Sequence, residues 1–233
     1  MPFDKFSQRK KTILSKQDKS SKGDWDEKIK SLCERINKKD NCFTTSSFSG
    51  RIVLMVEQDK KSEGLFRFVS HDLINVGELK GELNKLVSHS QAHSIIPTQK
   101  FASKRPTQIS DFVDINSINM SNVKSRSLIR IKRERLNIKF KQESCILHVA
   151  CRNLEDAFYL LDKARKTGWK RSGIISEGKG FVVELVSTEK LGFPIIHNGK
   201  IIVDDNFLKI IIKKSNENLK KSWNKIKELE KLV

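Results

Sequence analysis

The chain has 233 residues and a formal net charge of +18, so it is long enough for one domain with an insertion and basic enough to favour a polyanionic partner such as nucleic acid. It has no run of about 18 apolar residues and no apolar segment near its start, which argues against a membrane-spanning helix and a secretory signal. The four cysteines form no Cys-x-x-Cys pair, so a zinc ribbon or a disulfide scaffold is not expected. We expect them to be the reduced thiols of a cytoplasmic protein.

The first third of the chain predicts helices and strands in irregular order. Residues 3–15 predict a short basic helix. The recurrence of Trp25, Ile29, Leu32 and Ile36 predicts an amphipathic helix over 25–38, with Asp24 as its cap. After it we expect three strands and then a helix weakened by a glycine, at residues 42–47, 51–57, 65–71 and 76–87.

The remainder begins with residues 88–127, which are Ser-rich, basic and without periodicity, and therefore predict a loop or flexible insertion. Four strands are expected after it, at 136–140, 145–151, 172–176 and 180–187. A helix opened by Asn153 lies among them, and a long basic amphipathic helix ends the chain from Asp205. We therefore predict an α+β fold: a single domain, residues 1–233, with a mixed, mostly antiparallel sheet, flanking helices and a long C-terminal helix.

The excess positive charge is concentrated in three segments. Residues 1–24, 84–141 and 209–231 carry net charges of +4, +9 and +5, and the blocks between them are neutral. A neutral body with basic segments is typical of a polyanion binder, although a solvated Lys-rich surface is the alternative. An RNA contact through these segments would weaken with salt, because each neutralised phosphate releases counterions.

The densest polar cluster is the run Thr44-Thr45-Ser46-Ser47-Phe48-Ser49-Gly50-Arg51. Hydroxyl groups and backbone N–H groups beside a glycine turn can cradle a carboxylate or phosphate, and Arg51 can clamp it with two hydrogen bonds. The alternative is a polar β-hairpin whose hydroxyls satisfy its own backbone. The spacing alone does not separate the two.

His148 lies in an apolar strand in which alternation places it and Arg152 on one face, away from Cys145 and Cys151. A lone histidine in a strand is more often a core residue than a catalytic one, and the same holds for His71. Glu184, also in an apolar strand, either faces a site or lines a sheet edge. The other histidines lack ligand spacing, so no metal site is expected.

Familiar catalytic motifs are missing from the sequence. It contains no Gly-x-Ser-x-Gly, no His-Glu-x-x-His, no P-loop and no Gly-x-Gly-x-x-Gly after a strand, so a Rossmann nucleotide site is not expected. The residues alone indicate a basic α+β RNA binder with a polar Ser/Thr/Gly/Arg pocket.

Several segments together resemble the tRNA wybutosine-synthesizing protein 3 family. The matching runs, in family order, are FSQRKKTILSKQDKSSKGDWDEKI, NKKDNCFTTSSFSGRIVL, VSH, ESCILHVACRNLEDA, GWKRSGI and FPIIHNGKIIVDDNFL. The resemblance implies a cytoplasmic methyltransferase that uses S-adenosyl-L-methionine without a Rossmann site. Its expected substrate is the tricyclic 4-demethylwyosine-type base beside the anticodon of phenylalanine tRNA, which would be methylated on a ring nitrogen, N-4.

The resemblance also implies roles for single residues. Catalytic roles would fall to His148, Ser47 and Arg51: His148 would orient the acceptor nitrogen or take its proton, and Ser47, Ser49 and Arg51 would hold the methionine carboxylate or a phosphate. Cofactor binding is expected of Thr44, Thr45, Ser46, Ser49, Gly50, His71, Arg152, Ser172 and Gly173. The basic segments, rather than the resemblance, provide the residues expected to bind the tRNA anticodon arm, which are Lys10, Lys11, Lys19, Lys22, Arg130, Lys132, Arg133 and Arg135.

Two departures from the family pattern bear on these roles. Phe48 stands where the family usually has cysteine, and Glu143-Ser144-Cys145 stands where it has Glu-Pro-Phe. Two rival interpretations therefore stay open. One is a non-catalytic RNA-binding protein of the same fold, and the other is an RNA-modifying or RNA-cleaving enzyme that uses His71 and His148 without the cofactor.

Overall fold

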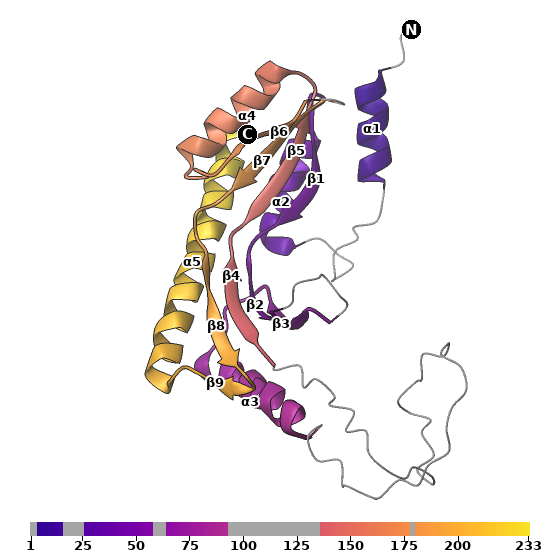
Figure 1. Ribbon diagram of the computed structural model, residues 1–233. Helices are drawn as coiled ribbons and strands as arrows, with labels where there is room; N and C mark the ends of the chain where they lie inside the picture. The colour runs from indigo at the N-terminus through magenta and orange to yellow at the C-terminus, as the bar shows by residue number, and fades with distance from the viewer. Residues whose placement is uncertain (1–3, 16–25, 58–63, 93–135, 178–179) are drawn as a thin grey trace, which may run out of the picture.

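A computed structural model describes residues 4–15, 26–57, 64–92, 136–177 and 180–233, which form two antiparallel sheets and five helices (Figure 1). Sheet A has the order β1-β5-β7-β6, and sheet B has the order β3-β2-β4-β8-β9. The strands of sheet A are β1 Cys42–Phe48, β5 Ile146–Cys151, β7 Phe181–Val186 and β6 Gly173–Ser176. Those of sheet B are β3 Phe66–Ser70, β2 Arg51–Val56, β4 Ile138–Glu143, β8 Leu191–His197 and β9 Lys200–Ile201.

Three strands of sheet A pass directly into strands of sheet B. β1 leads into β2 through residues 49–50, β4 leads into β5 through residues 144–145, and β7 leads into β8 through residues 187–190. Figure 1 shows β4 and β5 as one long bent ribbon. We call these three connections the seam. The chain therefore passes between the two sheets three times.

Each sheet buries one face under helices. In sheet A, the core contains residues of α2 (Glu27–Asn37), α4 (Leu154–Lys166) and α5 (Asp205–Leu232). In sheet B, it contains residues of α3 (Val76–Ala92) and of the first half of α5. The opposite face of sheet A, here the outer face, carries α1 (Lys5–Leu14), whose Phe6 ring lies 5.2 Å from that of Phe43.

Helix α5 takes part in both cores. Leu208 and Ile211 pack with sheet B, Ile226 and Leu229 pack with sheet A, and Trp223 lies against both clusters. These apolar positions recur at helical spacing, so one stripe of α5 faces both sheets. Within the described residues, no helix, including this long one, is apolar enough to cross a membrane.

At the seam, α5 makes polar contacts with the strand connections. Asn218 Nδ2 donates to Gln142 Oε1 at 2.9 Å, and Gln142 Nε2 donates in turn to the backbone oxygen of Glu189 at 3.1 Å. Lys225 Nζ lies 2.6 Å from Glu189 Oε1. Burial raises the pKa of Glu189, but the hydrogen bond and charge of Lys225 outweigh this and hold the pKa below its ordinary value. These polar side chains thus supply hydrogen-bond partners at the strand connections, where the backbone pairing of the sheets is interrupted.

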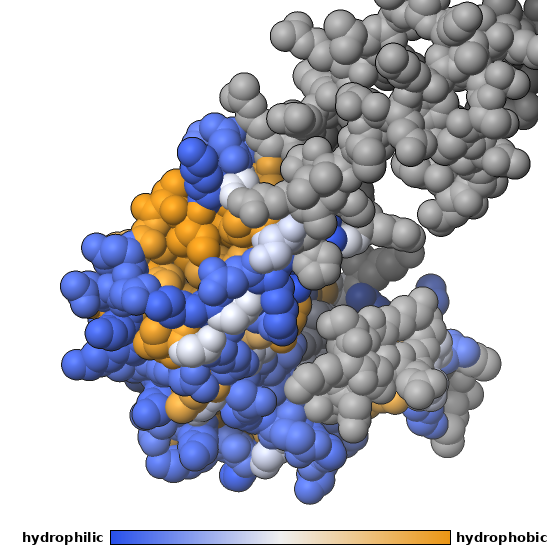
Figure 2. Space-filling model, turned by 90° about the horizontal axis from the view of Figure 1, so that it is seen from below, coloured by the Kyte–Doolittle hydropathy of each residue, from blue (hydrophilic) through white to orange (hydrophobic). Residues whose placement is uncertain are grey.

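The other end of sheet B exposes apolar side chains. Ile202, Phe207 and Ile210 are among the exposed large hydrophobic residues. Figure 2, which views the molecule from this end, shows an apolar patch surrounded by hydrophilic residues. The polar side chains considered for chemistry lie on sheet A and at the seam instead.

The predicted class is confirmed: the fold is α+β, with antiparallel pairing and a long C-terminal helix, and it is not a Rossmann arrangement. Three details were wrong. Asp26, not Asp24, caps α2, through its Oδ1 and the N–H of Lys28. The loop predicted from residue 88 starts too early, because α3 continues to Ala92, and its remainder lies outside the described residues.

The third error concerns strands, because β8 and β9 were not predicted. The hairpin, which the sequence left open as an alternative for the run around Ser49-Gly50, is excluded, since β1 and β2 belong to different sheets.

Gly50 is required at the seam. Its φ is +102°, and a Cβ there would lie 3.1 Å from both the backbone oxygen of Glu143 and Leu219 Cδ2 of α5. We expect Gly50→Ala to lower the free energy of unfolding by about 2 kcal/mol, since alanine disfavours positive φ and the neighbours must move. The measurement is urea denaturation.

Gly81→Ala is the matched control, because a Cβ at this helical glycine of α3 meets nothing within 4 Å. It should raise stability by about 0.5–1 kcal/mol. Equal effects of the two substitutions would contradict the requirement for glycine at the seam.

Candidate functional site

A row of polar and small residues crosses the outer face of sheet A. The register places Ser46 of β1 opposite His148 of β5, His148 opposite Glu184 of β7, and Glu184 opposite Gly173 of β6. We call these four residues the His148 row. Three of them were predicted as site residues from separate segments of the chain, and strand pairing brings them together.

His148 and Glu184 form the central contact of this row. His148 Nε2 lies 2.9 Å from Glu184 Oε1, and their side chains are 29% and 37% exposed. A carboxylate only accepts hydrogen bonds, so it favours the tautomer with the proton on Nε2 and leaves Nδ1 as an acceptor. Glu184 therefore lies in the His148 row, and its strand β7 is a central strand of sheet A rather than an edge strand.

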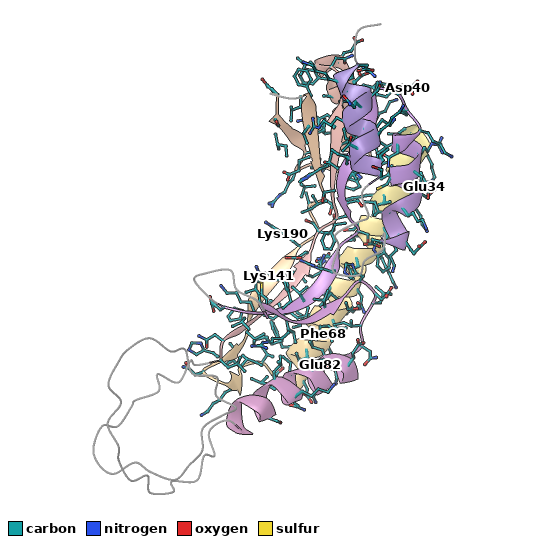
Figure 3. All side chains as sticks on the ribbon, turned by 90° about the vertical axis from the view of Figure 1, so that its right-hand side faces the viewer. Glu34, Asp40, Phe68, Glu82, Lys141 and Lys190 are labelled. Atoms are coloured by element: carbon teal, nitrogen blue, oxygen red, sulfur yellow. The ribbon has the colours of Figure 1, made fainter. Side chains whose placement is uncertain are left out.

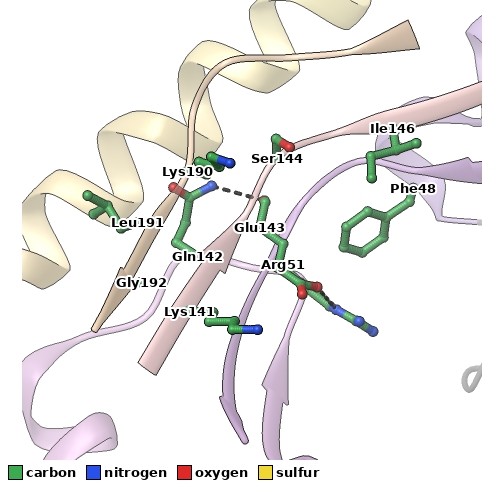
Figure 4. Close-up of a pocket in the computed structure, with 10 residues that line it drawn as sticks. All are labelled: Phe48, Arg51, Lys141, Gln142, Glu143, Ser144, Ile146, Lys190, Leu191 and Gly192. Atoms are coloured by element: carbon green, nitrogen blue, oxygen red, sulfur yellow. Dashed lines mark hydrogen bonds and ion pairs between the residues drawn. The ribbon is translucent and has the colours of Figure 1, made fainter. Parts of the chain in front are cut away.

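A cavity of about 760 Å³ adjoins the row at the seam (Figure 4). Its walls come from strands β1, β2, β4, β5 and β8 and from two of the three connections. The lining residues are Phe48, Arg51, Lys141, Gln142, Glu143, Ser144, Ile146, Lys190, Leu191 and Gly192. We call it the seam pocket. Because Ile146 and His148 lie two residues apart on β5, the pocket is about 7 Å from the row.

Arg51 is fixed in this pocket by three neighbours. Its Nε donates to Glu143 Oε2 at 2.7 Å, and its guanidinium carbon lies 4.9 Å from the centre of the Phe48 ring and 4.7 Å from that of Phe66. Cation–π contact with two rings restrains the guanidinium and leaves its Nη groups as donors. Phe48, where the family usually has cysteine, thus contributes an aromatic contact to Arg51.

On another side of Phe48 lies His71, whose ring meets the Phe48 ring edge-on at 5.8 Å. His71 Nδ1 is 3.6 Å from Asp26 Oδ2, which also accepts the backbone N–H of Ser49 at 3.0 Å. Asp26 was missed by the sequence reasoning. It lies in the run SKGDWDEKI, which resembles the family, and its place in that run could have marked it as a site residue.

Other predicted cofactor-binding residues have structural contacts. Thr44 is buried, and its N–H donates to Asn37 Oδ1 at 2.7 Å. Thr45 Oγ1 donates to the backbone oxygen of His148 at 3.4 Å, where the register of β1 shifts. Ser172 Oγ accepts the N–H of Val186 at 3.1 Å.

Ser47 and Arg152 do not belong to the row. The register pairs Ser47 with Leu147, whose side chain belongs to the core, so Ser47 lies on the opposite side of β1 from Ser46. Arg152 binds α1: its Nη1 donates to Asp4 Oδ2 at 2.9 Å. Hydrogen bonds from Ser7 and then from Arg152 lower the pKa of Asp4 to about 2.

Of the predicted RNA-binding residues, Lys10 donates to the backbone oxygen of Lys39 and Lys11 is exposed on α1. The rest lie outside the described residues: Lys19, Lys22, Arg130, Lys132, Arg133 and Arg135. No cluster of three metal-ligating side chains occurs in the part of the chain that the structure describes.

Comparison with known proteins identifies the family. Residues 8–233 match the family described as Methyltransferase TYW3. The chain belongs to this family. Members with a similar sequence include a Methanocaldococcus jannaschii protein named tRNA(Phe) 7-((3-amino-3-carboxypropyl)-4-demethylwyosine(37)-N(4))-methyltransferase, which is 27% identical over 96% of this chain and 97% of its own length. A Thermococcus sibiricus protein of the same name is 31% identical, over 96% and 91%.

A eukaryotic protein and a solved structure are also similar to this chain. The human tRNA wybutosine-synthesizing protein 3 homolog is 27% identical over 95% of this chain and 69% of its own length. The structure of PH1069 protein from Pyrococcus horikoshii superposes with a TM-score of 0.69 at 26% identity, covering 97% of this chain and 95% of that one. The predicted membership of this methyltransferase family is thus confirmed.

The contact between His148 and Glu184 makes a spectroscopic prediction. In the neutral ring of His148, ¹⁵N chemical shifts from two-bond ¹H–¹⁵N correlation should show the proton on Nε2. Glu184→Val removes the acceptor, so the proton should redistribute toward Nδ1. Glu155→Gln on α4, an exposed carboxylate of another element, is the control and should change nothing. An unchanged tautomer in Glu184→Val would contradict the assigned contact.

Proposed function

We propose that this protein methylates N-4 of a 4-demethylwyosine-type base in phenylalanine tRNA, the reaction named for its archaeal relatives. One observation carries the proposal: Ser46, His148 and Gly173, marked from separate family-like segments, lie in one row across an open sheet face, with Glu184 between the last two, beside a cationic pocket. We further propose that the base carries the 3-amino-3-carboxypropyl chain that appears in the names of those relatives.

The expected methyl donor is S-adenosylmethionine, whose sulfonium supplies an already activated methyl group. Two features fit its carboxylate. Ser49 Oγ is buried and has no hydrogen-bond partner among the described residues, and Arg51 keeps its Nη donors while Glu143 holds its Nε. Phe48 and Ile146 supply apolar surface next to them. The predicted roles of Ser49 and Arg51 therefore remain our proposal for donor binding.

With an activated methyl group, the protein needs to position the acceptor more than to supply strong acid–base catalysis. His148 Nδ1, left as an acceptor by Glu184, can orient the acceptor nitrogen or take its proton. Gly173 has open space around its Cα, which leaves room for a flat base against the sheet. Basic side chains such as Lys11 would contact the anticodon arm, in a salt-dependent manner.

The role of His148 is tested with precursor tRNA and S-adenosylmethionine. We expect His148→Ala to methylate the base roughly 100-fold more slowly, because a positioned acid–base group contributes about that much or more. His197→Ala, an exposed histidine at the end of β8 in sheet B, should keep the wild-type rate. Mass spectrometry of the released nucleoside gives the readout, and wild-type methylation by His148→Ala would refute the role.

Phe48 is the observation that favours a second candidate, a non-catalytic RNA-binding protein of the same fold. Calorimetry separates the two: binding of S-adenosylmethionine to the wild-type protein supports the methyltransferase, and no detectable binding supports the rival. Omitting the donor tests the remaining alternative, because an enzyme that uses only His71 and His148 would still change the tRNA.

A further inference from the structure

We propose that the seam pocket binds an α-amino acid group, with Lys141 and Lys190 holding its carboxylate and Glu143 holding its ammonium. None of these three residues was predicted from the sequence. The inference rests on the proposed function, because two of the molecules that function requires carry such a group. It adds a binding subsite beside the His148 row.

The charges in the pocket have a defined order. Lys141 and Glu143 alternate onto one face of β4, and Arg51 of β2 pairs with Glu143 in the register. Figure 4 shows the Glu143 side chain between those of Lys141 and Arg51. Figure 3 shows Lys141 and Lys190 on the side of the molecule that faces away from α5. An anion is thus flanked by cations at an open surface of the seam.

The positive charge in the pocket exceeds the negative charge. Arg51 is compensated by Glu143, with 2.7 Å between Nε and Oε2. Lys141 and Lys190 have no ion-pair partner among the residues that the structure describes. Two uncompensated ammonium groups favour an anionic oxygen group, such as a carboxylate.

The pocket also fits the rest of an α-amino acid group. Glu143 uses Oε2 for Arg51, and its second oxygen can accept a hydrogen bond from an ammonium. Phe48, Ile146 and Leu191 provide apolar walls for methylene groups. Gly192, opposite Lys141 in the register, adds no side chain over the lysine. The combination suits a zwitterion on a short aliphatic chain better than a bare phosphate.

Two molecules carry this chemistry. One is the base, through a 3-amino-3-carboxypropyl chain, and the other is S-adenosylmethionine, through its methionine end. In both, two methylenes separate the α-carbon from the remainder. The pocket adjoins the His148 row, so either molecule can extend from it toward the row.

The test uses the full-length protein with Lys141→Gln, Lys190→Gln and the double variant. Lys139→Gln is the matched control, because Lys139 alternates onto the same face of β4, pairs with Glu57 and lies outside the pocket. Circular dichroism should give the same Tm for all of them, since the substituted side chains are partly or fully exposed.

Calorimetry then compares ligands with and without the amino acid group. The first pair is S-adenosylmethionine and 5′-methylthioadenosine. The second pair is tRNA with and without the 3-amino-3-carboxypropyl chain on the tricyclic base. In one of the two pairs, each pocket variant should bind the ligand that carries the amino acid group about tenfold more weakly than the wild-type protein does. Its affinity for the ligand that lacks the group should be unchanged. Lys139→Gln should not change the affinity for either ligand in either pair.

A loss confined to S-adenosylmethionine assigns the pocket to the donor and replaces Ser49 and Arg51 as the residues proposed to hold its carboxylate. A loss confined to the substituted tRNA assigns the pocket to the base and leaves Ser49 and Arg51 to the donor. If the variants bind both ligands of each pair equally more weakly, or bind both with unchanged affinity, the pocket is not an α-amino acid site. Equal weakening of both tRNAs would indicate a phosphate contact instead. A wild-type protein that binds none of the ligands would refute the proposed function, whereas normal methylation with no discrimination by the variants refutes only the pocket.

Discussion

The structure depends on the contact of α5 with both sheets across the seam. The apolar stripe of the helix enters two separate cores, and between them Asn218 and Lys225 bind Gln142 and Glu189 at the strand connections. Without this helix, the two sheets would be joined only by three strand connections. Because the helix holds them together, His148 on sheet A keeps its distance from the Arg51–Glu143 pair on sheet B. The proposed chemistry requires such a fixed relation, since positioning is its main contribution.

Charge and chemistry occupy different parts of the chain. The net charge of +18 lies in three segments, and the strands that carry the His148 row come from the neutral blocks. The described part of the first segment is α1, which packs through Phe6 on the outer face of sheet A beside the row. A basic segment is thereby brought close to the site. Different residues on one face of the molecule can then bind the polyanion and orient the acceptor base.

The sequence predicted the elements whose evidence is local. Helical spacing of apolar residues located α2, α4 and α5, and alternation in β5 placed His148 and the buried cysteines on opposite faces. β8 was missed because Gly192 and Pro194 interrupt its strand pattern. Strand pairing is a long-range property, so the contact of His148 with Glu184 was not predictable, and the Ser49-Gly50 turn signal concealed a passage between two sheets. Alternation also distributes the Thr44–Arg51 cluster over two faces, which a linear motif does not show.

All the residue roles above depend on one activity, the methylation of the tricyclic base of phenylalanine tRNA by this chain. The most direct measurement is mass spectrometry of that base in tRNA from cells with and without the gene. Loss of the gene is expected to remove the N-4-methylated base and to accumulate its unmethylated precursor. The wild-type gene, but not the His148→Ala variant, is expected to restore the methylated base. An unchanged base in cells without the gene would contradict the account.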